Sequence, residues 1–240
     1  IAYANASDTP PASVQIDWTF SDGNTGSQGV GSALSAFGST TVNITAVNDP
    51  AAIGGTSSAS LIETDAAQST GGTLTVSDVD SPASFVARSN VAGSGGYGNF
   101  SLASNGVWSY AMTSAHDEFD AGATYTDTFT VAAADGTTHQ ITVSITGTND
   151  IASLGSDTQS LTETDAPLST GGTLTLSDPD TTAATVTPQT NAAGAYGQFS
   201  IDATGAWTYT TTSALDALDA GQVVTDTFAV TTTDGGRATV

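Results

Sequence analysis

The stretch LIETDAAQSTGGTLTVSDVD, residues 61–80, returns about 100 residues later as LTETDAPLSTGGTLTLSDPD, residues 161–180. The similarity continues along the chain, where YGNFSLASNGVWSY (97–110) matches YGQFSIDATGAWTY (196–209). A period of about 100 residues suits one β-sandwich domain per copy, because solenoid repeats are only about 20–50 residues long. The chain is therefore expected to be a tandem of sandwich domains.

Each copy is expected to hold seven short strands separated by turn signals. In the first copy we place them near residues 59–62, 73–77, 83–88, 98–103, 107–112, 125–133 and 139–146. Asn105-Gly106 and Asp135-Gly136 lie between alternating apolar and polar runs, which is a strong hairpin signal. Trp108 and Trp207 occupy the same point of one strand and are expected to pack in the core. The pattern predicts an all-β fold of tandem Ig-like Greek-key β-sandwich domains in an elongated array.

Asn-Asp pairs at residues 48–49 and 149–150 mark the expected domain boundaries. The stretches Val14–Phe20 and Thr40–Val47 look like the last two strands of a domain, separated by a Gly/Ser-rich loop. We therefore expect the C-terminal part of a preceding domain at 1–49 (the first segment), a complete domain at 50–149 (the first repeat), and a domain at 150–240 that stops within its last strand (the second repeat).

The charge balance is one-sided. Among 240 residues there are 2 basic and 24 acidic side chains, giving a formal net charge of -22, and cysteine is absent. Phosphate contacts to nucleic acid and binding to anionic membranes both need clustered Lys or Arg, so neither partner is expected. Disulfides and thiolate zinc sites are excluded as well. We expect a monomer whose partners are the neighbouring repeats of its own chain.

Most acids that recur in both repeats lie at strand ends. In a seven-stranded sandwich, the A–B and E–F connections meet at the end where the chain leaves, and the B–C and F–G turns meet where it enters. The junction between the two repeats is therefore expected to gather Glu63, Asp65, Asp117, Asp120, Asn149, Asp150, Asp178, Asp180 and Asp234. The preceding junction is expected to gather Asn48, Asp49, Asp78, Asp80 and Asp135. The exit end of the second repeat carries the equivalent acids Glu163, Asp165, Asp216 and Asp219.

Carboxylates that converge without Lys or Arg repel one another, and a hard divalent cation resolves the conflict. Ca²⁺ takes about 6–8 oxygen ligands at roughly 2.3–2.6 Å in a flexible geometry. The sequence therefore predicts several Ca²⁺ ions at the inter-domain junctions, with all the acids and amides above as candidate ligands. Two simpler interpretations of these acids stay open. In one they are turn residues, because Asp is common in turns, and in the other they keep a long protein soluble. Asp127 and Asp226 lie within a strand and receive no role.

The blocks LxETDAxxSTGGTLTxSDxD, FDAGATYTDTFTV and ITVSITGTND resemble the VCBS-type, cadherin-like repeats of large RTX-type bacterial surface adhesins. The resemblance covers about three-quarters of the chain, and residues 1–50 look like the tail of a related domain. It implies tandem Ig-like extender modules, Ca²⁺ at the linkers, a secreted or cell-surface location and a role in attachment or biofilm formation.

The leading functional hypothesis is a calcium-rigidified spacer that carries a distal binding region away from the cell. The alternative is a ligand- or carbohydrate-binding adhesion module that uses the loop 24–39. An enzyme is not expected. His116 and His139 have no counterpart in the second repeat, and no nucleophile-elbow, zincin or P-loop motif occurs. No catalytic residue is therefore assigned.

Overall fold

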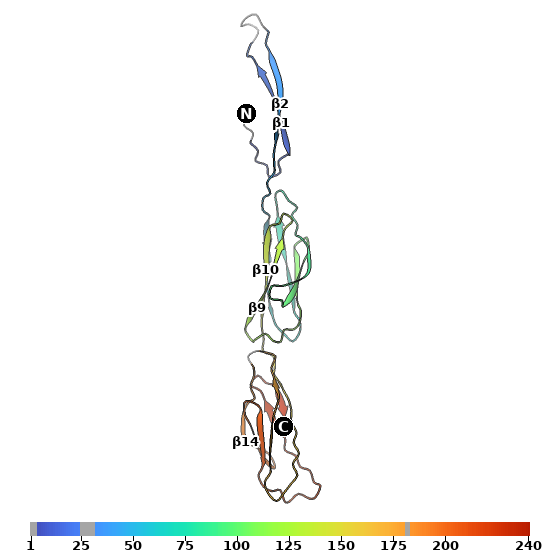
Figure 1. The fold of residues 1–240 in the computed structure, drawn as a ribbon, viewed down its shortest axis with the longest axis vertical. Helices are drawn as coiled ribbons and strands as arrows, with labels where there is room; N and C mark the ends of the chain where they lie inside the picture. The colour runs from blue at the N-terminus through green and yellow to red at the C-terminus, as the bar shows by residue number, and fades with distance from the viewer. Residues whose placement is uncertain (1–3, 25–31, 181–182) are drawn as a thin grey trace.

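A computed structural model describes residues 4–24, 32–180 and 183–240, and in these ranges all regular structure is β-strand. Figure 1 shows three bodies arranged end to end, and the chain passes through the first repeat from one end to the other. No sheet among the described residues mixes strands from different bodies. The expected all-β array of tandem Ig-like domains is confirmed. No helix in the described ranges is long and apolar enough to cross a membrane.

The first segment is a single hairpin of β1 (Ser13–Ser21) and β2 (Ser35–Asn43). The second strand was expected at 40–47 and lies earlier, because the antiparallel register continues to the pair Ser21–Ser35. Gly38 permits this pairing, since a Cβ there would lie 2.3 Å from the ring of Trp18. The expected loop 24–39 is thus shortened, and its residues 25–31 lie outside the described residues.

The first repeat is a sandwich of two sheets, in the orders β3-β5-β8-β7-β6 and β4-β10-β9. Strand β4 pairs with β10 in parallel, and the other pairings are antiparallel. The strands are β3 (Ala52–Gly55), β4 (Ser58–Ile62), β5 (Ser69–Ser77), β6 (Arg88–Ala92), β7 (Gly98–Leu102), β8 (Val107–Met112), β9 (Thr124–Ala132) and β10 (Thr138–Thr146).

Two strand predictions for this repeat need correction. The expected first strand at 59–62 corresponds to β4, and β3 precedes it as a strand that was not expected, with a break after Gly55, whose φ of +90° suits glycine. The expected third strand at 83–88 is wrong. Phe85 makes only an isolated bridge to Ala133 beside β9, while β6 from Arg88 onward pairs with β7 in the other sheet. The chain crosses between sheets here, so no continuous strand can form.

The second repeat repeats this plan with shorter strands. Its sheets are β11-β13, β12-β16-β15-β14 and β17-β18. The strands are β11 (Ser153–Leu154), β12 (Ser169–Thr173), β13 (Leu176–Ser177), β14 (Gln189–Ala193), β15 (Gly197–Ile201), β16 (Ala206–Thr211), β17 (Ala229–Thr231) and β18 (Arg237–Thr239). Residues 158–162 and 222–228, which align with β4 and the first half of β9, form no strand.

Each repeat has its own apolar core, and the repeated Trp lies within it as expected. Trp108 is 2% exposed and Trp207 is 3% exposed. The Trp108 indole packs over Gly72, where a Cβ would lie 2.9 Å from Nε1, which explains why the TGG motif accompanies the Trp in both repeats. The Trp108 Nε1–H donates to the Thr56 carbonyl at 2.7 Å.

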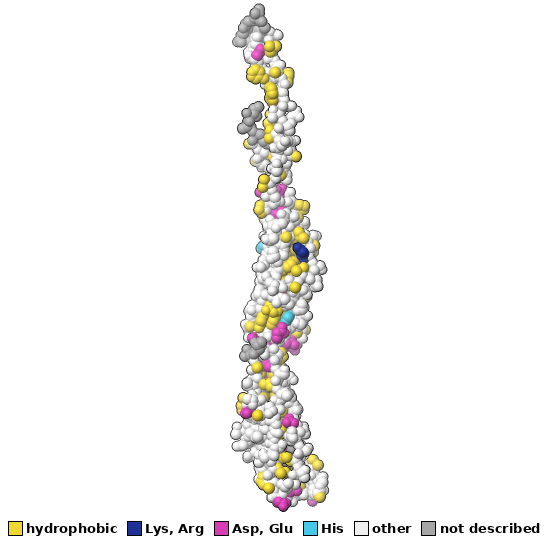
Figure 2. Space-filling view, in the orientation of Figure 1, with side chains coloured by type: hydrophobic (Ala, Val, Ile, Leu, Met, Phe, Trp, Pro, Cys, Tyr) yellow, Lys and Arg dark blue, Asp and Glu magenta, His cyan; other side chains and the backbone are white. Residues whose placement is uncertain are grey.

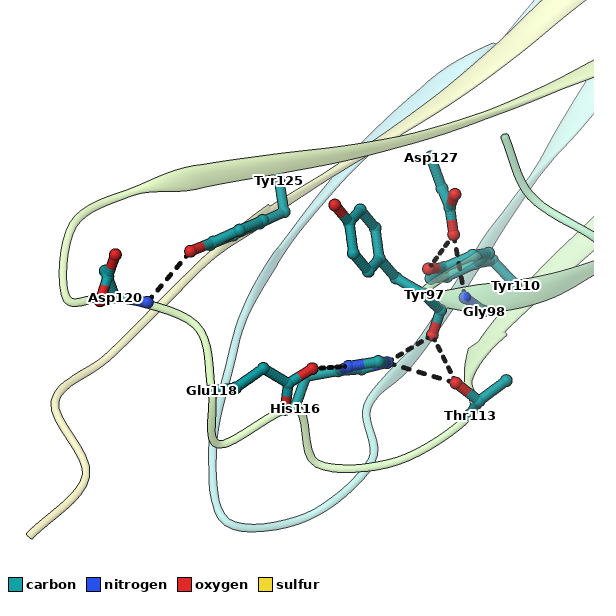
Figure 3. A network of polar contacts seen from close by, with 9 residues as sticks. All are labelled: Tyr97, Gly98, Tyr110, Thr113, His116, Glu118, Asp120, Tyr125 and Asp127. Carbon is teal, nitrogen blue, oxygen red and sulfur yellow. Dashed lines mark hydrogen bonds and ion pairs between the residues drawn. The ribbon is translucent and has the colours of Figure 1, made fainter. Parts of the chain in front are cut away.

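Asp127 is fully buried, and its carboxylate closes the loop between β6 and β7 (Figure 3). Its Oδ1 accepts from the backbone N–H of Gly95 at 2.5 Å and of Gly96 at 3.1 Å. Its Oδ2 accepts from the Gly98 N–H at 2.9 Å and from the Tyr110 hydroxyl at 2.8 Å. Burial and the contact with Asp127 raise the pKa of Tyr110 far above its usual value. Four donors thus compensate one buried charge.

Asp226 makes the same arrangement in the second repeat. It accepts from the backbone N–H groups of Ala195, Tyr196 and Gly197 and from the Tyr209 hydroxyl. Burial raises the pKa of Asp226, but these hydrogen bonds outweigh it and hold the pKa below its usual value. The spacing Tyr-x16-Asp in both repeats is therefore structural, and it gives Asp127 and Asp226 the role that the sequence left open.

Substituting Asp127 tests this structural role. In Asp127→Asn an amide NH₂ replaces one acceptor and faces backbone N–H donors, so we expect a loss of about 2–3 kcal/mol of unfolding free energy. Glu118→Gln is the control, because its exposed pair with His116 is worth under about 1 kcal/mol. Urea unfolding of the first repeat measures both. Equal stability of the two variants would contradict the assignment.

Candidate metal centre at the repeat junctions

Glu63 is fully buried at the point where the first repeat meets the linker. Its backbone N–H donates to the Thr146 carbonyl at 2.8 Å, which extends the pairing of β4 with β10 by one residue. Its Oε2 accepts from the backbone N–H of Thr148 at 2.9 Å and from the Thr148 hydroxyl at 2.6 Å. Oε1 has no hydrogen-bond partner among the described residues. A buried carboxylate oxygen without a donor is costly, which makes Glu63 Oε1 a candidate ligand for a cation.

Asp117 reaches the same place from the loop between β8 and β9. Phe119, two residues on, is 2% exposed and stacks against Tyr125 with ring centroids 3.7 Å apart. The Asp120 N–H donates to the Tyr125 hydroxyl at 3.1 Å, which fixes the far side of the loop (Figure 3). The apolar anchor inside the run His-Asp-Glu-Phe-Asp thus holds the neighbouring acids at the end of the sandwich.

The carboxylates of Glu63, Asp117 and Asp150 converge, with one oxygen of each within 4.8 Å of the others. The second repeat contributes Asp180, whose Oδ2 accepts from the Asp150 N–H at 3.1 Å. Asp180 is 6% exposed. Two oxygen atoms here, Oδ1 of Asp180 and Oδ2 of Asp150, are buried and have no hydrogen-bond partner among the described residues. Figure 2 shows acidic side chains gathered on the visible face where the first repeat ends.

The negative charge at this junction is uncompensated. Burial, followed by the charges of Glu63, Asp117, Asp180 and Asp65, raises the pKa of Asp150 to about 6. Within the described ranges, the only ion pair joins His116 to Glu118. The cluster therefore draws on acids from the first repeat, the linker and the second repeat, with no basic side chain to neutralise it.

Two other predicted ligands here act chiefly as supports for the backbone. Asp178 accepts from the N–H of Asp180 at 3.1 Å and of Ala184 at 2.5 Å. Asp234 accepts from the Ala152 N–H at 2.6 Å and from the Thr232 hydroxyl. Both carboxylates shape the turns at the entry end. Asn149 is exposed and donates from its side chain to the Asp150 carbonyl at 3.3 Å.

The junction before the first repeat has the same plan. The Asp49 N–H donates to Asp80 Oδ2 at 3.0 Å, and the Ala51 N–H donates to Asp135 Oδ2 at 2.9 Å. Asp78 Oδ2 and Asp80 Oδ1 are buried and, among the described residues, have no partner. Asn48 lies alongside, where its Oδ1 accepts from the Ser81 hydroxyl at 3.1 Å. Hydrogen bonds from Thr137, then from Ala51 and Asn48, lower the pKa of Asp135 to about 2.

At the far end of the second repeat, Glu163, Asp165 and Asp216 also lie with one oxygen of each within 4.8 Å of the others. All three are exposed, whereas their counterpart Glu63 is fully buried. Asp219 follows in the same loop, where its backbone N–H donates to the Gln222 side chain at 3.0 Å. This cluster has no Asn-Asp linker against it in the described structure.

The donor sets fit a hard cation. The clustered oxygens lie within 4.8 Å of one another, so one Ca²⁺ at about 2.4 Å from each ligand could contact all three. Carboxylate oxygens suit Ca²⁺ rather than softer metals, and cysteine ligands are absent from the chain. The assignment of individual ligands stays a prediction. Thr148 was missed, because one more threonine in a threonine-rich chain carries no signal, although it orients Glu63.

The fold and the junctions together define a class: tandem cadherin-like β-sandwich domains joined by acidic linkers. Residues 48–147 and 149–240 both match the family model of the bacterial cadherin-like domain, so the chain belongs to this family. The resemblance to cadherin-like repeats expected from the sequence is confirmed. No curated protein matches the chain. Cadherin-like domains are generally not enzymes, and no enzyme family is indicated.

Among solved structures, the chain is similar to the protocadherin GammaB4 extracellular domain, with 16% identity, a TM-score of 0.47, and coverage of 95% of this chain and 36% of that one. It is also similar to mouse cadherin-23 EC22-24, with 18% identity, a TM-score of 0.44, and coverage of 96% and 73%. The chain spans 36% and 44% of the length of the protocadherin GammaB4 and Gamma B2 structures, respectively.

The raised pKa of Asp150 predicts how pH acts on the junction in EDTA. The pKa of Asp150 is about 6 in the folded chain and lower in the unfolded chain, so the folded chain binds the proton more tightly. Protonation of Asp150 therefore stabilises the folded state, and this stabilisation is lost as pH rises through 6. We expect the melting temperature to increase as pH falls from 7 to about 4.5, before acids such as Asp135 protonate. Asp150→Asn should flatten this gain. If the melting temperature instead falls steadily as pH is lowered from 7 to about 4.5, the charge repulsion between Asp150 and its acidic neighbours does not destabilise the junction.

Proposed function

We propose that the chain is a set of calcium-rigidified extender domains of a large bacterial surface adhesin, which project a distal ligand-binding region for attachment or biofilm formation. The observation that carries this proposal is a group of buried carboxylate oxygens that have no partner among the described residues: Glu63 Oε1, Asp150 Oδ2 and Asp180 Oδ1. These atoms come from the first repeat, the linker and the second repeat, so cations bound among them would link the two repeats.

The stiffening follows from electrostatics. Without an ion, Glu63, Asp117 and Asp150 repel one another, and the repulsion falls when the linker bends away. A divalent cation replaces that repulsion with attraction to each carboxylate in a partly dehydrated site. The angle between the two repeats then becomes fixed. The same reasoning applies to the preceding junction through Asp78 and Asp80. Several ions along the chain would convert a flexible array of domains into a rigid, extended one.

The cellular role rests on the family and on the sequence blocks. Tandem cadherin-like domains are consistent with an extracellular adhesion or extender role. The VCBS and RTX adhesin resemblance supports a bacterial surface or secreted location. Ca²⁺ modules outside cells bind with Kd values of about 10⁻⁴–10⁻³ M, so the sites would fill only after export. We propose a monomer that uses its neighbouring repeats as partners and binds neither nucleic acid nor membrane directly.

The alternative, a ligand- or carbohydrate-binding module on loop 24–39, gains no supporting observation. Residues 25–31 lie outside the described residues, and 35–39 belong to β2. Two similar repeats in tandem also favour a spacer, because a recognition site is usually single.

Calcium titration of the full chain tests the proposal. At a Ca²⁺ concentration about 100 times Kd, a site found only in the folded state adds about 2.7 kcal/mol of stability. We expect Ca²⁺ to raise the melting temperature and to extend the particle in small-angle X-ray scattering. Glu63→Gln should remove most of both effects at the central junction.

The matched control is Glu163→Gln, which makes the same change at the equivalent exposed position of the second repeat. It should leave the extension between the repeats intact. In EDTA, Glu63→Gln should be at least as stable as the parent, because the amide carries no buried charge. A chain whose shape and melting temperature are the same in EDTA and in millimolar Ca²⁺ would sink the proposal.

Thr148 provides a second test. Its hydroxyl and N–H orient Oε2 of Glu63, so Thr148→Val removes one charge-assisted hydrogen bond, worth about 1.5–3 kcal/mol. We expect Ca²⁺ affinity at the central junction to fall roughly tenfold per 1.4 kcal/mol lost. Isothermal titration calorimetry measures the change, with Thr142→Val at a half-buried position of β10 as the control. Unchanged affinity would exclude this orienting role.

A further inference from the structure

Three consecutive residues at the end of β10 contact two different parts of the first repeat. The carbonyl of Thr146 accepts from the Glu63 N–H at 2.8 Å, and the N–H and hydroxyl of Thr148 donate to Glu63 Oε2. Gly147 lies between them, is buried, and forms its hydrogen bonds with the loop between β8 and β9 (residues 113–123). The backbone groups of neighbouring residues in an extended chain point to opposite sides, so Gly147 contacts the loop while its neighbours hold Glu63.

Gly147 pairs with this loop through a β-bulge. Its N–H donates to the Ala123 carbonyl at 3.0 Å, and its carbonyl accepts from the Gly122 N–H at 2.9 Å. Two residues of the loop thus oppose one residue, with a glycine at a φ of +75° in the first position of the bulge. The Ala123 N–H also donates to the Asp120 carbonyl at 3.0 Å, so the bulge closes a four-residue turn at 120–123.

A side chain at position 147 has no space. A Cβ there would lie 2.6 Å from the carbonyl oxygen of Phe119 and closer still to that of Asp120. Both oxygens belong to the backbone, so neither can rotate away as the end of a side chain could. The backbone angle is not the reason for glycine here, because Gly147 does not have a positive φ. Position 147 requires glycine because the loop packs directly against the backbone at this point.

The loop that packs on Gly147 carries Asp117. The Phe119 N–H donates to the His116 carbonyl at 3.0 Å, which closes a turn around Asp117. The Phe119 side chain is 2% exposed, so this turn is anchored in the apolar core, and the Phe119 carbonyl is one of the two that lie against Gly147. The position of Asp117 is therefore tied to the contact between the loop and Gly147.

Gly147 thus stands between two of the clustered acids. Glu63 is held by the residues on either side of Gly147, and Asp117 is held by the loop that packs on it. One oxygen of each acid lies within 4.8 Å of the other and of Asp150. A methyl group at position 147 would push the loop away, and the repulsion between the two carboxylates would act in the same direction. The distance between Glu63 and Asp117 would then increase.

We propose that Gly147 is a positioning residue for the cation site between the two repeats. It lets the loop between β8 and β9 pack against the backbone after β10, which holds Asp117 at a distance from Glu63 that one cation spans. Gly147 acts through Asp117 and Glu63 and supplies no side chain of its own. The inference rests on the proposed function, because it concerns the same calcium site.

Calcium titration of the full chain by isothermal titration calorimetry compares the parent with Gly147→Ala. The added methyl group overlaps the Phe119 and Asp120 carbonyls, so the loop must move and Asp117 moves with it. Groups that hold a metal ligand in place change metal affinity by about 10–100-fold when they are altered, so we expect a loss of this size at the site between the repeats. In EDTA, exchange of the Gly122 amide should become faster, because its acceptor is the Gly147 carbonyl.

Gly71→Ala is the matched control. A Cβ at Gly71 would lie 2.5 Å from the Trp108 carbonyl oxygen, so it creates the same kind of overlap inside the pairing of β5 with β8 rather than at the junction. This variant should unfold at a lower urea concentration than the parent and bind Ca²⁺ with unchanged affinity. A loss of Ca²⁺ affinity as large as that of Gly147→Ala would mean that any strain in the repeat weakens the site, which would overturn the positioning role.

A double-mutant cycle separates positioning from general destabilisation. If Gly147 acts through Asp117, the substitution Gly147→Ala should have little further effect on Ca²⁺ affinity in a chain that already carries Asp117→Asn. Two residues with independent roles would instead give losses that add in full. Full additivity would therefore overturn the inference, whereas a strongly reduced effect supports it.

Gly122→Ala is the second variant, for use if Gly147→Ala does not fold. A Cβ at Gly122 meets nothing within 4 Å, but its φ of +75° disfavours a side chain, so the substitution strains the bulge without an overlap. We expect a smaller loss of the same Ca²⁺ affinity. A parent chain that binds Ca²⁺ no more tightly than either variant would overturn this inference alone. A parent chain that binds no Ca²⁺ would overturn the proposed function as well.

Discussion

The structure depends on where a strongly acidic chain can bury negative charge. Two buried carboxylates of the first repeat show the two solutions. Asp127 has four donors within hydrogen-bonding distance, so its charge is compensated by the protein itself. Glu63 is as deeply buried, but Oε1 has no partner among the described residues. Asp127 closes a loop within one domain, whereas Glu63 carries a negative charge that is not fully compensated and lies at the boundary with the next domain.

This contrast separates structural acids from candidate ligands better than acidity alone. Asp178 and Asp234 have donors on both oxygens, whereas Asp150 and Asp180 each keep one buried oxygen that has no partner in the described part of the chain. The latter two also touch across the boundary between the linker and the second repeat. The uncompensated carboxylate oxygens of this junction therefore lie at the boundary between the repeats, where a bound cation would affect the angle between them.

Much of the fold and of the junction chemistry could be predicted from the sequence, because the chain contains two copies of one domain. The alternation of apolar residues and the Asn-Gly and Asp-Gly turns located β8, β9 and β10 closely. The third strand could not be found, because whether Phe85–Arg88 pairs with β9 or with β7 depends on sheet crossing rather than on local pattern. The role of Asp127 was also hidden, since its donors are backbone N–H groups of a glycine-rich loop 29–32 residues away.

The two repeats also act as a comparison within one molecule. They share the Glu-Thr-Asp motif, the core Trp and the Tyr–Asp pair, yet Glu63 is fully buried and Glu163 is exposed. The difference cannot come from the motif, which is the same. In the first repeat, Thr146 at the end of β10 and Thr148 just after it contact Glu63, whereas the sequence ends at Val240, before the residues that correspond to these two. The pairing of β4 with β10 thus continues to the Glu63–Thr146 hydrogen bond, and it holds Glu63 beside the linker that carries Asp150.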